Sequence, residues 1–365
     1  MKKPTTEIEA EEFLREYKEK GSLILSQKYN KTKRTMERWR RSCEKIIKSI
    51  PEEESIKGRS VLKTWRDDEG NYCAEWTKTN KEYDDARERI ESIVEALKED
   101  LPRYAPKKPP LFALKDLLTT FNLADAHIGM QSKDWDVKTA EETIKNWIDY
   151  AIALAPKSET AVFCNLGDLH HYDGSLPVTP ASGHVLDADG SEMDMIKAIV
   201  RSIRYCIDRL LENFKYVHFI SCEGNHDLSN SGYLAVLIDA VYENEKRLTV
   251  DLSRNNFYAY EWGNTSLFYH HGHKRNIKNV SQVFAGMFRD LYGRAQYSYG
   301  HIGHYHHKQS IEDSLMFVRI HPTISGKDAY AVKSGYLSQR SSNIITYSKK
   351  YGYQGEFAVT PEMLL

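Results

Sequence analysis

The segment "ETAVFCNLGDLHH" (residues 159–171) decides the fold class of the larger part of this chain. Its apolar run ends at Gly167-Asp168, a pattern typical of a buried strand that leads into a loop with polar groups. The same pattern recurs elsewhere in the sequence, in "LLTTFNLADAH" (117–127), "YVHFISCEGNH" (216–226) and "TSLFYHHGH" (265–273). We therefore expect several buried strands, each followed by a loop that carries chemistry.

Segments with helical periodicity lie between these strands, at residues 138–155 and 193–214. Alternating strands and helices predict a layered α/β domain with functional groups at the strand ends, here over residues 112–365. The proline-rich segment "LPRYAPKKPPL" (101–111) predicts a linker, and residues 1–100 a separate N-terminal module.

The overall composition excludes several classes of protein. The 365 residues contain 51 Lys and Arg and 52 Asp and Glu, so any preference for nucleic acid, membrane or acidic substrate must be local. Five cysteines without a CxxC pair argue against a disulfide framework or a thiolate zinc site, and they favour a reducing cytoplasm. The N-terminus is acidic and amphipathic, and no apolar run approaches the roughly 18 residues of a membrane span. We expect a cytoplasmic protein that does not contact a membrane.

The N-terminal module resembles a helix-turn-helix unit. Residues 8–50 predict a helix, a glycine break, a short helix, a turn near Asn30 and a third helix. Residues 28–48 hold nine Lys and Arg against two Glu, so phosphate contact is one interpretation and a solvated helix face over a small core is the other. Residues 60–79 predict two strands around Asp68-Glu69-Gly70, and residues 80–99 a charged helix, as in a wing. The nucleic-acid candidates are Lys33, Arg34, Arg38, Arg40 and Arg41.

Five polar blocks follow the predicted strands in order: "DAH" at 125, "GDLHH" at 167, "GNHD" at 224, "HGH" at 271 and "GHYH" at 303. Each block alone is weak, because a single histidine or aspartate is more often a hydrogen-bonded core residue. Together, over about residues 117–310, they resemble the signature blocks of the calcineurin-like metallophosphoesterase family. The resemblance implies a four-layer α-β-β-α sandwich with two mixed sheets and a dinuclear metal site at the strand ends.

The resemblance also implies the ligands. Asp168 would bridge two divalent cations, which repel each other and therefore need a shared carboxylate. Mixed imidazole and oxygen donors suit Mn²⁺, our first choice, and also Fe²⁺, Zn²⁺, Ni²⁺ or Mg²⁺. The first cation would be held by Asp125, His127, Asp168 and His306, and the second by Asp168, Asn225, His271 and His304.

Three further residues are catalytic candidates by the same resemblance. His226 would act as general acid or stabilise the transition state, and Asp227 would orient it. The block after Asp168 departs from the Gly-Asp-x-x-Asp-Arg-Gly of serine/threonine protein phosphatases. His171, three residues after Asp168, resembles instead a histidine of the double-strand-break repair exonuclease branch that helps at the phosphate; its alternative role is packing. Water activated by the cations would be the nucleophile.

The remaining polar residues near these blocks have alternative roles. His301 and His307 are expected to support the ligands or lie at the surface, His270 to be structural, and His273 to lie near the substrate. In the loop after Asp168, solvation is favoured over metal contact. That loop carries His184, Asp187 and Asp189.

The leading function is a metal-dependent DNA nuclease of the repair-exonuclease type. A phosphatase or phosphodiesterase acting on phosphoproteins or small nucleotides is the second hypothesis, and a DNA-binding regulator with a structural metal site is the third. The repair exonucleases are expected to carry a DNA-binding cap after the catalytic domain, whereas only about 55 residues follow the last block here. That tail carries Lys327, Lys333, Arg340 and Lys349 among tyrosines. It is expected to complete the second sheet, and lining a substrate groove is the alternative. A second copy of the chain and an ATPase are the candidate protein partners, and the sequence selects neither.

Overall fold

The computed structural model describes residues 7–48, 60–66, 72–78, 105–180, 183–253, 255–327 and 338–364. The chain divides into two compact units, Met1–Asp84 and Asp85–Leu365. The predicted turn at 68–70 and the predicted helix over 80–99 lie outside the described residues. None of the helices in the described ranges is long and apolar enough to cross a membrane.

The smaller unit contains two helices and a hairpin. Helix α1 (Glu7–Lys28) is kinked at Gly21, whose φ of 74° is a conformation that only glycine adopts easily. Asn30, at φ 49°, lies in the turn before α2 (Lys33–Lys48). Phe13, Leu25, Met36, Trp39 and Cys43 form the buried core between these helices. Strands β1 (Ser60–Arg66) and β2 (Tyr72–Lys78) pair antiparallel.

The larger unit is built on two mixed sheets. The six-stranded sheet has the order β13-β12-β3-β4-β5-β6, in which β3, β4, β5 and β6 are parallel and β12 and β13 are antiparallel additions. Its strands are β3 (Leu114–Leu123), β4 (Ser158–Asn165), β5 (Tyr216–Ser221), β6 (Leu248–Val250), β12 (Ser342–Ser348) and β13 (Gly352–Val359).

The five-stranded sheet has the order β10-β11-β9-β8-β7, with β11, β9 and β8 parallel to one another. The outer strands β10 and β7 pair antiparallel with their neighbours. Its strands are β7 (Tyr258–Trp262), β8 (Thr265–His270), β9 (Tyr297–Ile302), β10 (Gln309–Glu312) and β11 (Phe317–Ile320). The tail thus contributes β11 to the sheet of β8 and β9, but its last two strands extend the sheet of β3 instead of the second sheet that was expected.

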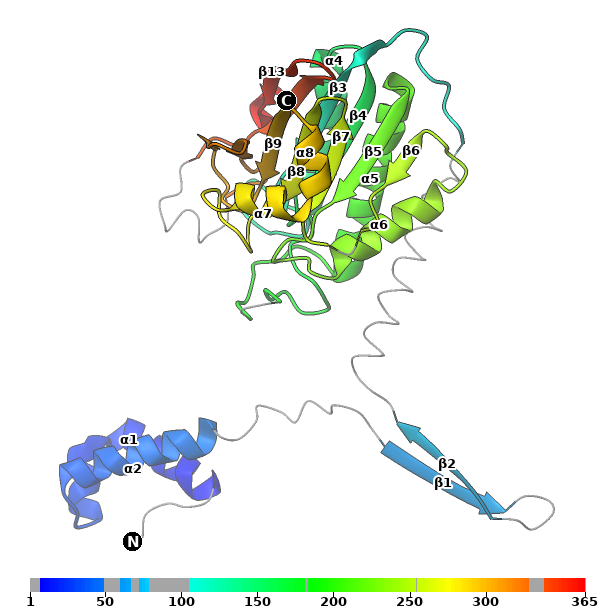
Figure 1. The fold of residues 1–365 in the computed structure, drawn as a ribbon. Coiled ribbons are helices and arrows are strands. Elements are labelled where there is room, and N and C mark those ends of the chain that lie inside the picture. The colour runs from blue at the N-terminus through cyan, green and yellow to red at the C-terminus, as the bar shows by residue number, and fades with distance from the viewer. Residues whose placement is uncertain are drawn as a thin grey trace. The chain divides into compact units, whose positions relative to one another are not determined.

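Alternating side chains on each strand create three apolar layers. On β4, Ala161 and Phe163 face the helices, while Val162 and Cys164 face the other sheet. Phe268 and Ile302 of the second sheet pack outward with α7 and α8 (Figure 1). The predicted four-layer sandwich is confirmed. Its helices are α4 (Val137–Leu154), α5 (Glu192–Asn213), α6 (Asn230–Val241), α7 (Val280–Met287) and α8 (Arg289–Arg294), and a 3-10 turn, η1 (Pro361–Met363), follows β13.

Candidate metal centre

All the predicted ligands follow the carboxyl ends of parallel strands. Asp125 comes after β3, Asp168 after β4 and Asn225 after β5 in the first sheet. His271 comes after β8, and His304 and His306 after β9, in the second sheet. Because parallel strands end at the same edge of a sheet, packing the two sheets face to face brings both sets of loops together.

The first group of ligand atoms comes from Asp125, His127 and His306, which lie within 4.8 Å of one another. His306 Nε2 lies 3.2 Å from Asp125 Oδ1 and 3.4 Å from His127 Nε2. Asp125 and His127 are buried, whereas the His306 side chain is 41% exposed. This group therefore opens to solvent on the His306 side.

The second group consists of Asp168, His271 and His304. His271 Nε2 lies 3.1 Å from Asp168 Oδ2 and 3.2 Å from Asn225 Oδ1. The other ring nitrogen of His271, Nδ1, lies 2.8 Å from the Leu166 carbonyl. A hydrogen bond from Nδ1 fixes the ring so that Nε2 faces Asp168 and Asn225, as metal-binding histidines are usually oriented.

Five of the predicted ligands adopt a left-handed backbone conformation. Outside glycine, the described residues contain six with positive φ, and only Asn30 of these is not a predicted ligand. Such conformations cost of order 1–3 kcal/mol each and are concentrated at functional sites. The five strained ligands are Asp125 (φ 49°), His127 (φ 42°), Asp168 (φ 52°), His304 (φ 72°) and His306 (φ 53°).

The loops around Asp168 leave no room for a side chain at Gly224. A Cβ there would lie 2.1 Å from Asp168 Oδ1 and 2.3 Å from the Asp168 backbone nitrogen. The backbone N–H of His226 donates to the same Oδ1 at 2.8 Å. Glycine at 224 therefore lets the β5 loop approach the Asp168 carboxylate directly.

Asp227 is buried and does not line the cavity described below. Its Oδ1 accepts the backbone N–H groups of Gly224 (2.9 Å) and Asp168 (3.2 Å). Its Oδ2 accepts those of Leu169 (3.0 Å) and His170 (3.3 Å). Asp227 thus positions the loop that carries Asp168. Besides these backbone groups its Oδ2 contacts His170 Nδ1 at 3.3 Å, and among the described residues no hydrogen bond or ion pair joins Asp227 to the His226 ring that it was expected to orient.

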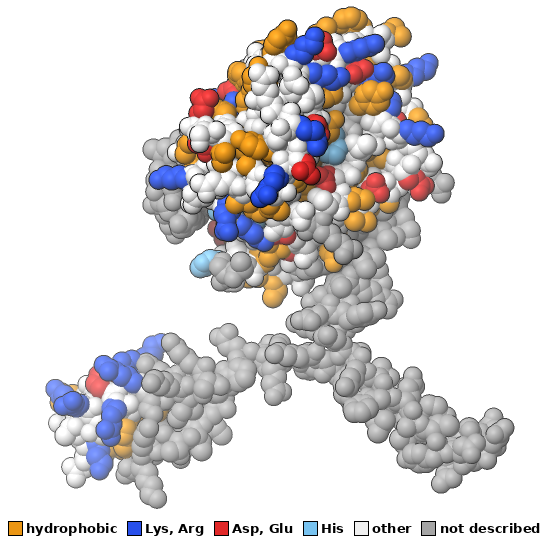
Figure 2. Space-filling model, in the orientation of Figure 1, with side chains coloured by type: hydrophobic (Ala, Val, Ile, Leu, Met, Phe, Trp, Pro, Cys, Tyr) orange, Lys and Arg blue, Asp and Glu red, His pale blue; other side chains and the backbone are white. Residues whose placement is uncertain are grey.

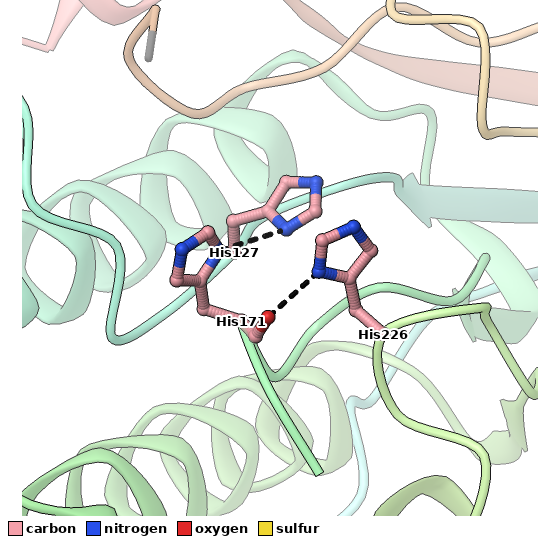
Figure 3. Close-up of side chains that lie close together, drawn as sticks. All are labelled: His127, His171 and His226. Atoms are coloured by element: carbon pink, nitrogen blue, oxygen red, sulfur yellow. Dashed lines mark hydrogen bonds between the residues drawn. The ribbon is translucent and has the colours of Figure 1, made fainter. Parts of the chain in front are cut away.

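His226 and His171 stand beside His127, as Figure 3 shows. His226 Nδ1 donates to the carbonyl of His171 at 2.7 Å, which leaves Nε2 as the nitrogen free to act on a ligand. The His171 and His226 rings stack with centroids 5.7 Å apart, and His171 Nδ1 lies 3.4 Å from His127 Nδ1. The three histidines therefore form one cluster next to the first group of ligands.

The pKa values of the histidines in this centre are shifted in different directions. Burial, followed by repulsion from His226, lowers the pKa of His171 to about 3, so this ring is neutral near pH 7. Burial also lowers the pKa of His127. For His271 burial acts in the same direction, but the Asp168 carboxylate outweighs it and raises the pKa to about 10. Without a cation, His271 is therefore protonated near pH 7 and forms an ion pair with the Asp168 carboxylate.

A cavity of about 520 Å³ opens over these groups. His127, Asp168, Asn225, His226, His304 and His306 line it. Lys327 and Arg340 of the tail line it too, which corresponds to the groove-lining alternative for that segment. Other lining residues were not singled out in the sequence, namely Met130, Tyr305, Thr323 and Ser325. The coil after β11 supplies Thr323, Ser325 and Lys327, and it has no periodicity that could have indicated them.

The other histidines near the blocks lie away from this cavity, except His307, which lines it. His301 is buried, with Nδ1 2.9 Å from His321 Nε2 and Nε2 3.2 Å from the Tyr347 hydroxyl. His270 stacks on Phe257 with ring centroids 4.2 Å apart, a structural role. His273 does not line the cavity, although its ring centroid is 5.4 Å from that of His271.

The loop after Asp168 does not add ligands. His184, Asp187 and Asp189 belong to none of the metal-binding groups found among the described residues. Asp189 Oδ2 instead accepts the backbone N–H of Val137 at the start of α4, 2.9 Å away. His184 and Asp187 are thus exposed to solvent, and Asp189 caps the start of α4.

The predicted nucleic-acid residues lie on α2 of the smaller unit. Lys33, Arg34, Arg38 and Arg41 are exposed, whereas Arg40 is partly buried and bonds Glu37 at 3.3 Å. In Figure 2, Lys and Arg predominate on the described surface of this helical unit.

The residues of the centre fit two divalent cations. Two groups each supply one carboxylate and two imidazoles, and Asn225 adds a neutral oxygen beside His271. Carboxylate, imidazole and amide are the donors that Mn²⁺, Fe²⁺ and Zn²⁺ accept. Buried carboxylates are stable as ions only beside compensating charge, which two cations would supply.

No protein-family model matches this sequence, and no curated protein matches it significantly. Solved structures do match. An archaeal phosphodiesterase is 15% identical, with 66% of this chain and 99% of that chain covered, at a TM-score of 0.34. Vps29 complexed with Zn²⁺ from Entamoeba histolytica is 11% identical, with 67% and 99% covered, at 0.31. Purple acid phosphatase PPD1 from yellow lupin (Lupinus luteus) seeds is 8% identical, with 82% and 59% covered, at 0.32.

Proposed function

We propose that this chain is a calcineurin-like metallophosphoesterase that hydrolyses phosphodiester bonds of DNA with two divalent cations. The observation that carries the proposal is the convergence of both groups of carboxylate and imidazole ligands, five of them in strained backbone conformations, on one open cavity. Structural metal sites are closed by protein ligands, whereas this centre opens to a cavity, which disfavours a purely structural metal.

Each of the two groups of ligands would hold one cation. Asp125, His127 and His306 would hold one cation, and His271, His304 and Asn225 the other. Asp168 lies 3.1 Å from His271 and lines the same cavity, in a position to be shared between the two. When bound, the cations would neutralise the phosphate and activate water for attack.

His226 is the residue we assign to proton transfer. Its Nδ1 is held by the His171 carbonyl, so its Nε2 can donate a proton only when the ring is an imidazolium. A protonated His226 would stabilise negative charge on the phosphate or protonate the leaving oxygen. The lowered pKa of His171 keeps this ring neutral near pH 7, and the ring stacks on that of His226.

DNA is favoured as the substrate by two sets of cationic side chains. Lys327 lines the cavity beside the ligands, where its ammonium group can contact a phosphate. Arg340 also lines the cavity, but its guanidinium is ion-paired with Asp134 (3.0 Å) and Glu362 (3.6 Å), so the argument from the cavity rests on Lys327. The exposed Lys and Arg of α2 add a basic surface in the smaller unit. A polyanion that contacts both sets gains affinity through counterion release.

The test is hydrolysis of end-labelled single- and double-stranded DNA by the purified full chain with Mn²⁺. Asp168→Asn and His226→Ala should each lower the rate at least a hundredfold, because they remove the shared carboxylate and the proton donor. His184→Gln is the matched control, since it replaces a histidine that does not line the cavity. Intact DNA, or equal rates for all variants, contradicts the proposal.

A second candidate is a phosphodiesterase acting on small nucleotides. The cavity volume of about 520 Å³ favours it, because such volumes are typical of small-molecule sites. It predicts metal-dependent hydrolysis of bis-p-nitrophenyl phosphate and cyclic nucleotides while DNA remains intact. The same preparations and variants distinguish the two candidates.

A further inference from the structure

The smaller unit carries a row of exposed arginines opposite its apolar core. Met36, Trp39 and Cys43 of α2 are buried against α1. At about 100° per residue, Arg34, Arg38 and Arg41 fall within an arc of roughly 60° on the other side of the helix. The three arginine side chains are therefore exposed on the side of α2 opposite the buried residues.

No acidic side chain in the described part of the chain contacts these arginines directly, although Arg41 interacts electrostatically with Glu37. Among the residues that the structure describes, Arg34, Arg38 and Arg41 have no ion pair or hydrogen bond through their side chains. Lys31 and Lys33, at the start of α2, are exposed and likewise unpaired within the described ranges.

The nearby carboxylates are already compensated. Glu16 is bound by Lys28 (2.5 Å), Lys20 (2.9 Å) and the Tyr29 hydroxyl (2.7 Å). Glu37 accepts from Tyr17 and from Arg40. The described side chains of α1 and α2 thus present a surface with an excess of positive charge (Figure 2).

The geometry of the row fits the major groove of duplex DNA. Arg41 lies seven positions after Arg34, which is about 10 Å along a helix that rises 1.5 Å per residue. The major groove of B-DNA is about 12 Å wide and admits one helix, whereas that of duplex RNA is too deep and narrow. Thr32 caps α2 by accepting the Thr35 N–H at 3.1 Å, which places Lys31 and Lys33 at the helix start, where phosphates bind.

We propose that α2 binds duplex DNA, with Arg34, Arg38 and Arg41 in the major groove and Lys31 and Lys33 on the adjacent phosphates. The proposal deepens the proposed function, since it names the form of DNA that the nuclease engages. It gives the enzyme a binding surface that needs no metal and no turnover.

The test measures DNA binding in a full chain that cannot cut. Asp168→Asn protein is titrated with a labelled 20-base-pair DNA duplex in EDTA, and the same measurement is made with Arg34→Gln/Arg38→Gln added. The double variant should bind at least tenfold more weakly, and the slope of log K against log salt should fall by about 0.9 for each phosphate that the variant no longer neutralises. Arg15→Gln/Lys18→Gln removes the same charge from exposed positions of α1 and should change affinity less than threefold.

Duplex RNA of matched sequence and anionic lipid vesicles are the competing ligands. DNA affinity at least tenfold above that for RNA, together with the weaker binding of the α2 variant, supports the proposal. Equal weakening in both double variants, or tighter binding to RNA or vesicles, overturns it. Because binding is measured in EDTA with an inactive chain, failure here is distinct from failure of the nuclease assay.

Discussion

Substituting Asp227 by asparagine tests how the loop that carries Asp168 is held. Asp227 is fully buried, and its two oxygens accept four backbone N–H groups, from Gly224, Asp168, Leu169 and His170. An asparagine keeps one acceptor oxygen and turns an NH₂ group toward two of these donors. Each buried N–H left without an acceptor costs about 1–3 kcal/mol, so with two such donors the variant should lose about 2–6 kcal/mol of unfolding free energy.

The assay is urea unfolding followed by near-UV circular dichroism, with Mn²⁺ affinity measured alongside. Asp173→Asn is the control, because Asp173 also accepts two backbone N–H groups, of Ser229 (2.7 Å) and Asn230 (3.2 Å), but at a more exposed helix start. It should lose about 1 kcal/mol or less. If Asp227→Asn unfolds within about 0.5 kcal/mol of the parent and binds Mn²⁺ equally well, the reasoning is refuted.

Three further predictions concern the centre and the smaller unit. Gly224→Ala should abolish Mn²⁺-dependent hydrolysis, because the new Cβ would lie 2.1 Å from Asp168 Oδ1; retained activity in a phosphodiester assay contradicts this. Removing cations with EDTA should lower the thermal midpoint of the larger unit, since a ligand present at 100 times its Kd stabilises by about 2.7 kcal/mol; an unchanged calorimetric midpoint argues against bound metal. Lys28, with Lys20, lowers the pKa of Glu16 from 4.5 to about 2, so this contribution to stability is present above pH 4.5 and is lost as the pH falls toward 2. Helical circular dichroism of Glu16→Gln should show weaker pH dependence in that window than the parent, and identical curves would count against the ion pairs.

The layered fold was predictable because apolar runs of strand length alternate with segments of helical periodicity. Ala161 and Phe163 alternate with Val162 and Cys164, and both faces of β4 are buried, so the segment is apolar throughout and ends sharply at Gly167. The position of β12 and β13 beside β3 depends on pairing over more than 200 residues, which local patterns do not specify.

The ligands were predictable because each follows a strand in a short polar block. Their geometry was not, since the left-handed conformations of His304 and His306 come from tertiary contacts such as the His304 N–H to Asp125 at 2.9 Å. Asp227 was expected to orient His226, and its backbone role appears only when the β4 and β5 loops are seen together. Lys327 and Arg340 lie in coil, so the sequence could offer groove lining as an alternative for the tail but could not choose it.

The central claim is that these side chains hold two cations, and anomalous diffraction from Mn²⁺-soaked crystals tests it most directly. The account predicts two manganese peaks, one beside Asp125, His127 and His306 and one beside Asn225, His271 and His304, with Asp168 between them. A single peak, or peaks away from these residues, would contradict it.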